Sequence, residues 1–281
     1  MDEAILEQSL KFLDTLDVPL DKVKFFGGEP LLQKKQIQKI VTSFPKRHSP
    51  NFYVTSNSTL IDQNFIDFSD EYGLKLTFSI DGDAHTTAEN RKVLWGIDLS
   101  AKIIENTKKY HTHIRINQVI TSANAHLFFE NFKFIYDLWV REFNFLPEYY
   151  RPWTKKGLVD LQKGFQQILD FHSKGNSMYL VNSENYSETS FFNLGIVIDT
   201  DGSIYGTNLI LAGIFEKYKP ELKIGDIYSG ISIDIHDATF QSNYVAKVQE
   251  FLKMQYDEQT IKSVRYVDMI LSNFVNQFEW K

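Results

Sequence analysis

Phe25-Phe26-Gly27-Gly28-Glu29-Pro30 is the stretch of sequence that decides the fold. It closes the apolar run 23–26, which predicts a short strand, with two glycines, a carboxylate and a proline. Glycine lets the backbone come close to a ligand, and the N–H and C=O groups of the backbone are then offered to that ligand. The stretch therefore predicts a ligand-facing loop at the end of a strand.

Outward from this loop, apolar runs alternate with amphipathic runs. The patterns predict helices over 3–15, 31–44, 63–72 (stopped by Gly73), 100–110 and 125–139, and strands over 23–26, 52–55, 74–80, 114–120 and 142–146. Alternating strands and helices with short loops indicate a parallel sheet. Because a helix comes first, we predict an α/β fold in which a partial (β/α)6 TIM-like barrel lacks its first strand.

The pattern changes after Pro147, so we predict a barrel domain over 1–150 and a C-terminal α+β extension over 151–281. The extension contains a predicted helix over 158–171 and an irregular stretch over 173–193. A hairpin over 195–205 turns at Asp199-Thr200-Asp201-Gly202, since Asp-Gly is a strong hairpin signal. Residues 240–280 are predicted to be helical.

Composition excludes several classes of protein. The 281 residues are 43% hydrophobic, which suits a sizeable core, and carry a formal net charge of −6 without a long basic run, which argues against nucleic-acid binding. No apolar window of about 18 residues predicts a membrane span. The acidic start is unlike a signal peptide, so we predict a cytoplasmic protein. With no cysteine, disulfides and thiolate metal sites are excluded.

Polar motifs follow successive predicted strands. After the glycine loop come Thr55-Ser56-Asn57-Ser58, then Ser79-Ile80-Asp81-Gly82, then a strand carrying Arg115 and Asn117, then Pro147-Glu148. Each motif alone has an ordinary reading as a tight turn or a helix-capping loop. Ligands gather at the carboxyl ends of parallel strands, so the series predicts one pocket.

Three other stretches carry polar or aromatic residues in patterns that suggest a site. The pair His111-x-His113 shares one face of a strand but lacks a third ligand, so no metal site is predicted. The turn at 199–202 lacks the later ligands of a calcium loop. Residues 148–153, with Tyr149, Tyr150 and Trp153, predict either an aromatic substrate wall or a packed loop. No catalytic residue is assigned.

The order of these motifs resembles that of radical S-adenosylmethionine (SAM) enzymes, in particular peptide-modifying enzymes of the sulfatase-maturating type. Those enzymes carry Gly-Gly-Glu-Pro on the second barrel strand, Thr-Asn-Gly-Thr-Leu on the third and Ser-Ile/Leu-Asp-Gly on the fourth. The matching residues are 27–30, Ser56-Asn57-Ser58-Thr59-Leu60, and 79–82 followed by His85 and Arg91. The likeness spans 3–147, and a weaker one at 201–205 and 224–227 resembles the twitch or SPASM extension.

The resemblance implies a cofactor-binding set. Gly27, Gly28 and Glu29, with Pro30, would meet the methionine amino end of SAM. Asn57, Ser79 and Asp81 would line the ribose or carboxylate end. Carboxylates and carbonyls accept hydrogen bonds from an ammonium, and hydroxyls and amides satisfy ribose hydroxyls.

The chain departs from this family at the iron–sulfur cluster. The family holds a [4Fe–4S] cluster on a Cys-x3-Cys-x2-Cys loop, and clusters are held mainly by cysteine thiolates. This sequence has no cysteine, and Thr207 stands near the place expected for the first auxiliary cysteine. SAM cleavage is chemistry of the cofactor, so the resemblance implies that this form binds no cluster and cleaves no SAM.

Two hypotheses stay open, and with them whether the chain is an enzyme. It is either a degenerate relative that acts as a binding or partner subunit for a peptide or a partner enzyme, or an N-terminally truncated fragment of an active peptide-modifying enzyme. The strand 23–26 would be an apolar edge of the sheet, which predicts a covering segment or an oligomer formed through that strand.

Overall fold

The computed structural model describes residues 1–91, 97–185, 194–231, 234–235 and 237–279, and the chain forms two compact units. One unit comprises Met1–Lys22, Lys35–Pro50 and Ser187–Asp257, and the other comprises Val23–Lys34, Asn51–Tyr186 and Glu258–Lys281. The second unit carries the strand-end motifs. The expected domain boundary at residue 150 stays a prediction.

Among the described residues, the sheet of the motif-bearing unit has six strands in the order β1-β2-β3-β4-β5-β6. Their bounds are β1 Lys22–Phe25, β2 Asn51–Ser56, β3 Lys75–Ser79, β4 Ile114–Ile120, β5 Glu142–Pro147 and β6 Tyr179–Leu180. The strand pairs β2–β3, β3–β4, β4–β5 and β5–β6 are all parallel. Sequence order and spatial order coincide, as in a barrel wall. The fold is thus the predicted α/β, TIM-like arrangement, with β1 at one end of the described sheet.

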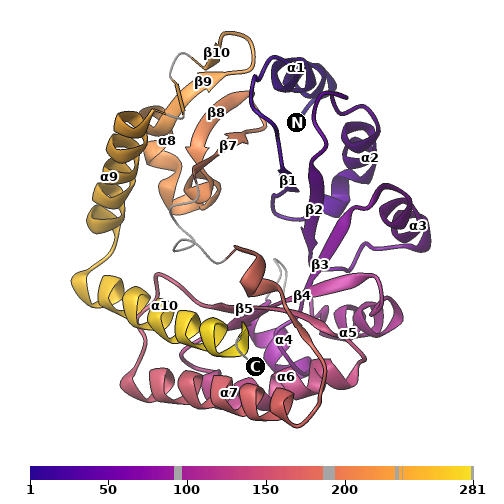
Figure 1. Cartoon of the computed structure of the whole chain (residues 1–281), viewed down its shortest axis with the longest axis vertical. Coiled ribbons are helices and arrows are strands. Elements are labelled where there is room, and N and C mark those ends of the chain that lie inside the picture. The colour runs from indigo at the N-terminus through magenta and orange to yellow at the C-terminus, as the bar shows by residue number, and fades with distance from the viewer. Residues whose placement is uncertain (92–96, 186–193, 232–233, 236, 280–281) are drawn as a thin grey trace. The chain divides into compact units, whose positions relative to one another are not determined.

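Helices connect these strands. Their bounds are η1 Pro30–Gln33, α2 Lys34–Thr42, α3 Gln63–Tyr72, α4 Ala84–Asn90, α5 Ser100–Lys109, η2 Ala125–Leu127, α6 Phe128–Asp137, α7 Lys155–Ser173, η3 Val181–Asn185 and α10 Glu258–Glu279. Helix α3 shows why they form: the Asp62 carboxylate accepts from Phe65 N at its start, and Gly73, at φ 64°, ends it in the left-handed conformation. Figure 1 shows α3, α5 and α6 along one face of the sheet.

The two faces of this sheet differ in chemistry. The face toward the helices is apolar and buried, with Val54, Phe78, Ile116 and Phe143 at most 1% exposed. We call the opposite side the inner face. Its residues on β2–β5 are Tyr53, Thr55, Lys75, Thr77, Ser79, Arg115, Asn117, Val119, Glu142, Asn144 and Leu146, nearly all half-buried. A packed TIM barrel fills this side with layers of Val, Ile and Leu, whereas here it is mostly polar.

Aromatic side chains hold helices to the apolar face. The rings of Phe128 and Phe132 on α6 lie 5.3 Å from Phe145 and 4.9 Å from Phe143 on β5, centroid to centroid. Phe274 of α10 stacks on Phe165 of α7 at 4.3 Å. Such pairs contribute beyond the area that they bury. This core fixes which residues of β5 point to the helices and which point to the inner face.

The other unit contains an antiparallel sheet in the order β10-β9-β8-β7. Its remaining elements are α1 Glu3–Asp14, β7 Leu194–Ile198, β8 Ser203–Thr207, η4 Asn208–Leu211, η5 Gly213–Tyr218, α8 Lys219–Leu222, β9 Lys223–Asp226, β10 Gly230–Ile231 and α9 Ala238–Gln255. Strands β7 and β8 form the predicted hairpin, closed by Asp199 N donating to Ser203 O at 2.9 Å. Gly202, at φ 86°, supplies the left-handed turn residue. The α+β extension is therefore present.

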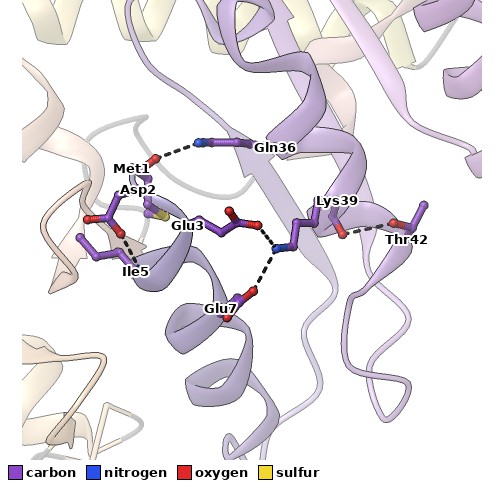
Figure 2. A network of polar contacts seen from close by, with 8 residues as sticks. All are labelled: Met1, Asp2, Glu3, Ile5, Glu7, Gln36, Lys39 and Thr42. Carbon is purple, nitrogen blue, oxygen red and sulfur yellow. Dashed lines mark hydrogen bonds and ion pairs between the residues drawn. The ribbon is translucent and has the colours of Figure 1, made fainter.

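Helix α2 connects β1 to β2 along the chain but packs in this unit, where one lysine joins it to α1. Lys39 Nζ lies 2.7 Å from Glu3 Oε1 and 3.1 Å from Glu7 Oε1, as Figure 2 shows. Gln36 also donates to the carbonyl of Met1 at 2.8 Å. Glu3 and Glu7 are exposed and the Lys39 side chain is partly exposed, so these ion pairs contribute little to stability.

Several element predictions needed correction. The helix expected over 31–44 begins as a 3-10 turn at Pro30 and becomes α-helical at Lys34. Helix α4 was missed because its sequence Ala-His-Thr-Thr-Ala-Glu-Asn has no apolar stripe, although Asp83 caps it. The helical stretch 240–280 is two helices, because Tyr256 is extended and ends α9.

The irregular stretch expected over 173–193 contains α7's last residue, β6 and η3, and its residues 186–193 lie outside the described part. No helix among the described residues is long and apolar enough to cross a membrane.

Candidate functional site

The Gly-Gly-Glu-Pro loop is fastened to the end of β2 by its carboxylate. Glu29 Oε1 accepts from Ser56 Oγ at 2.7 Å and from Leu31 N at 3.0 Å, and Oε2 accepts from Asn57 N at 2.9 Å. A carboxylate has about four acceptor positions, so one position on Oε2 remains. The same side chain therefore caps η1, joins two strand ends and keeps room for one more donor.

The two glycines of this loop are not required by packing. A Cβ built on Gly27 or on Gly28 meets no atom within 4 Å, and neither residue has a positive φ. Both are exposed, and so are Phe26 (67%) and Leu32 (70%) on either side. The space beside these glycines is open, as a loop that receives a ligand against its backbone requires.

The second loop, after β2, is held by hydrogen bonds within the loop and by one from helix α5. Asn57 Oδ1 accepts from Thr59 N at 3.0 Å and from Thr59 Oγ1 at 2.7 Å. Ser58 is fully buried at φ 64°, a conformation that glycine adopts freely and serine rarely does. Asn106 donates to the carbonyl of Ser58 at 2.8 Å. The loop tip is thus a strained backbone held by α5, a type of feature that clusters at functional sites.

The third loop, after β3, is built on a buried ion pair. Asp81 Oδ1 accepts from Arg91 at 2.6 Å and from Val119 N at 2.9 Å, and the Asp81 side chain is 1% exposed. Its Oδ2 has no hydrogen-bond partner among the described residues. Asp81 therefore joins β3 to β4 and to the end of α4, and it is closed off from solvent.

Gly82 in the same loop is a packing requirement. A Cβ there would lie 2.0 Å from Asn131 Oδ1, and Asn131 Oδ1 also accepts from Asp83 N at 3.3 Å. The glycine of the Ser-Ile-Asp-Gly motif thus allows α6 to pack closely against the loop. Gly27 and Gly28 have no such packing role.

An ion-pair network lies deeper on the inner face. Arg115 Nε is 2.8 Å from Glu142 and its Nη2 is 2.8 Å from Glu184, which also accepts from Tyr179 at 3.1 Å. Burial alone would raise the pKa of Glu184, but the hydrogen bond and charge of Arg115 outweigh it and lower that pKa. The network ties β4, β5, β6 and η3 together.

The stretch 148–153 is a packed loop and not an open aromatic wall. Tyr149 donates to Asp268 at 3.2 Å, and Trp153, 5% exposed, donates from its ring to the carbonyl of Glu148 at 2.8 Å. Burial raises the pKa of the Glu148 carboxyl, and the charge of Arg151, 3.6 Å away, opposes this.

The structure brings the predicted site residues to one edge of one sheet. Glu29 touches the backbone of Asn57, and β2 and β3 end side by side because Ser56 pairs with Phe78. Ser79 pairs with Asn117 on β4. The assignment of Gly27, Gly28, Glu29, Pro30, Asn57, Ser79 and Asp81 to SAM stays a prediction.

Sequence reasoning missed three residues of this region. Arg91 was noted only for its likeness, not as the partner of Asp81, and Asn144 and Glu184 were not singled out. For Asn144 a signal existed: strict alternation in Glu142-Phe143-Asn144-Phe145 puts it opposite the two phenylalanines. Glu184 lies in a 3-10 turn that no pattern indicated.

The described residues contain no group of three or more His, Cys, Asp and Glu side chains placed to hold a metal. His113 pairs with Asp70 at 2.9 Å, and His111 contacts the carbonyl of Lys108. Since the 281 residues include no cysteine, they supply no thiolate for an iron–sulfur cluster, and such a cluster does not fit this chain.

Comparisons with solved structures agree on the fold. The structure of native anSMEcpe with bound AdoMet (SAM) matches with a TM-score of 0.75 at 17% identity, over 100% of this chain and 91% of that one. Native anSMEcpe with bound AdoMet and Kp18Cys peptide matches with a TM-score of 0.73 at 18% identity, with the same coverage. anSMEcpe is a radical SAM sulfatase-maturating enzyme.

Sequence comparisons are sparser. No family profile matches the chain. A curated relative, the uncharacterized protein MJ0907 of Methanocaldococcus jannaschii, is 28% identical over 152 residues. The match covers 52% of this chain and 52% of the relative, so the chain spans about half the length of that protein.

Fold and strand order together define the class of fold: a partial TIM-like barrel with an α+β extension, similar to the fold of the anSMEcpe structures. The predicted resemblance to that superfamily is confirmed at the level of the fold, in a chain that has no cysteine.

Gly82→Ala is expected to lower the free energy of unfolding by about 1–3 kcal/mol, because the new methyl overlaps Asn131. Urea unfolding measures it. Gly28→Ala is the matched control and should unfold within about 0.5 kcal/mol of the wild type, since open space surrounds it. Equal losses in both variants would contradict this account of the loops.

Arg91→Gln is expected to destabilise the fold by about 3 kcal/mol, because it leaves the buried Asp81 carboxylate without its cation. Lys133→Gln removes the cation of the exposed Lys133–Asp137 pair and should cost at most about 0.5 kcal/mol. Chemical denaturation of both variants checks the contrast. An Arg91→Gln protein as stable as Lys133→Gln would mean that the ion pair does not hold the loop.

The lowered pKa of Glu184 gives a pH signature. Its ion pair stabilises the fold above the ordinary carboxyl pKa of 4.5, and that contribution is lost as pH falls through the lower pKa of the folded state. The stability difference between wild type and Glu184→Gln should therefore shrink between pH 6 and pH 3. Melting curves across this range test it, and a difference independent of pH would exclude the ion pair as its source.

Proposed function

We propose that this chain is a SAM-binding relative of peptide- and protein-maturation enzymes that acts, in this form, as a binding or partner subunit without radical chemistry. The observation that carries the proposal is the open Gly27-Gly28 loop, fastened by Glu29 to the end of β2, in a barrel of the radical SAM type. The similar anSMEcpe structure holds AdoMet, and another holds a peptide as well.

In the proposed SAM site, the backbone of Gly27 and Gly28 and the remaining acceptor position on Glu29 Oε2 meet the amino end of the ligand. Ser79 and Asn57 supply a hydroxyl and an amide to its polar groups, and Pro30 starts η1 behind the loop. Asp81 does not contact the ligand in this proposal. Its buried carboxylate holds the loop after β3 in place by binding Arg91 and Val119 N. SAM lends itself to radical cleavage only beside a reducing cluster, so no such step is proposed.

The extension fits the same proposal as a twitch- or SPASM-like appendage without a cluster. The weak likeness at 201–205 and 224–227 falls on the hairpin β7–β8 and on strand β9, which pairs with β8, and this supports the proposal. Thr207, 2% exposed, uses its hydroxyl to cap η4 by accepting from Leu209 N. A residue with that structural task stands where the resemblance places a cluster ligand.

The second candidate is a fragment of an active peptide-modifying enzyme whose cluster loop lies outside these 281 residues. The motif that the resemblance assigns to a second barrel strand follows β1, the end strand of the described sheet, and this favours the fragment. The coding DNA upstream of Met1 separates the candidates: an in-frame Cys-x3-Cys-x2-Cys stretch supports the fragment, and a stop codon removes it.

Calorimetric titration with SAM tests the site. We expect the wild type to bind SAM with one-to-one stoichiometry, and Gly28→Ala to bind at least ~10-fold more weakly at an unchanged melting temperature, because the added methyl occupies the ligand's place. Anaerobic reconstitution with iron and sulfide is the companion measurement, and we expect no bound iron. If SAM gives neither heat nor a thermal shift, the proposed SAM site is wrong. If iron binds stoichiometrically, the proposal that this chain holds no iron–sulfur cluster is wrong.

A further inference from the structure

We propose that Asn117 and Asn144, side by side on the inner face, form a subsite that binds the backbone of a peptide through one of its N–H and one of its C=O groups. The inference rests on the proposed function, because a peptide occupant belongs to it, and it names the atoms that would contact that peptide.

The register places the two side chains together. Asn117 of β4 pairs with Asn144 of β5, and Ser79 of β3 is the next residue in the same row. Asn144 Nδ2 donates to Asn117 Oδ1 at 2.8 Å. This bond uses one donor and one acceptor, so the pair keeps an NH2 group on Asn117 and a carbonyl oxygen on Asn144. Reversing both amides leaves the same two kinds of group.

These remaining groups complement a peptide backbone. A peptide residue offers one N–H and one C=O, which need an acceptor and a donor. The chain itself shows the chemistry with a single amide: Asn182 donates to Phe145 O at 2.9 Å and accepts from Phe145 N at 2.8 Å. Asn182 thereby recognises the open edge of β5, and the Asn117–Asn144 pair carries the same two functions on the inner face.

The surroundings favour a neutral occupant over an anion. The row below contains Arg115, whose charge is already met by Glu142 and Glu184 at 2.8 Å each. The pair itself is uncharged, and Val119 and Leu146 lie two residues farther along the same strands, on the same side. A carboxylate or phosphate would therefore find amide groups and apolar side chains but no unmatched cation from Arg115.

The polarity of the row also needs an explanation. Both asparagines are half-buried in a position where a packed barrel carries Val, Ile or Leu. Polar side chains placed among apolar ones in a binding site fix the orientation of a ligand and add specificity. A link between the two strands alone would need one hydrogen bond. It would not use the NH2 group of Asn117 or the carbonyl oxygen of Asn144.

Side-chain NMR of the 15N-labelled chain of 281 residues tests the subsite directly. The probe is acetyl-trialanine N-methylamide, a peptide without charge. We expect saturable shifts of the Asn117 and Asn144 NH2 signals. Asn117→Leu and Asn144→Leu should each weaken binding about 5–10-fold, the loss expected for one hydrogen bond. Asn90→Leu, on the exposed surface of α4, is the control and should leave the affinity unchanged.

The outcomes separate this inference from the proposed function. Unshifted asparagine signals, or Leu variants that bind the peptide like the wild type, overturn the subsite even when SAM still binds. Equal shifts of these signals with sodium acetate would overturn the preference for a peptide backbone. Peptide-induced shifts in a protein that gives no heat with SAM would uphold the subsite and remove only the SAM part of the proposed function.

Discussion

The register of the parallel strands β2–β5 is the constraint on which the candidate site depends. Side chains alternate between the two faces of a strand, so a slip of one residue would move every polar inner-face residue into the helix layer. Phe143 and Phe145, both fully buried against α6, fix the register of β5. The aromatic core thus places Asn144 beside Asn117 and keeps the carboxyl ends of the strands in register.

Two carboxylates then join neighbouring strands in the same way. Glu29 accepts from the backbone N–H of Asn57 just after β2, and Asp81 accepts from that of Val119 on β4. Each also binds a second group in its surroundings, Ser56 Oγ or Arg91. An acid in the glycine motif and an acid in the Ser-Ile-Asp-Gly motif therefore have structural tasks, whether or not a ligand is bound.

Sequence reasoning was strongest where a local rule and the fold agree. Strand β4 was predicted to the residue, because Ile114–Ile120 is rich in β-branched residues, and Gly73 ends α3 as its position implied. It failed where only tertiary contacts decide. Helix α4 has no apolar stripe, and the two-residue strand β6 is formed by pairing with β5. The site followed the same division: motifs predicted the loops, whereas Glu184 became visible only through its contact with Arg115.

The two kinds of glycine in these loops carry opposite information about function. Packing alone requires glycine at position 82, with or without a ligand, because a side chain there collides with Asn131. Gly27 and Gly28 have neither a positive φ nor a close neighbour, so folding places no demand on them. Glycine also loses more conformational entropy on folding than other residues, so two glycines in an open loop lower the stability of the fold. The SAM ligand of the proposed function would supply a reason that packing does not, because the amino end of SAM needs acceptors and space rather than thiolates.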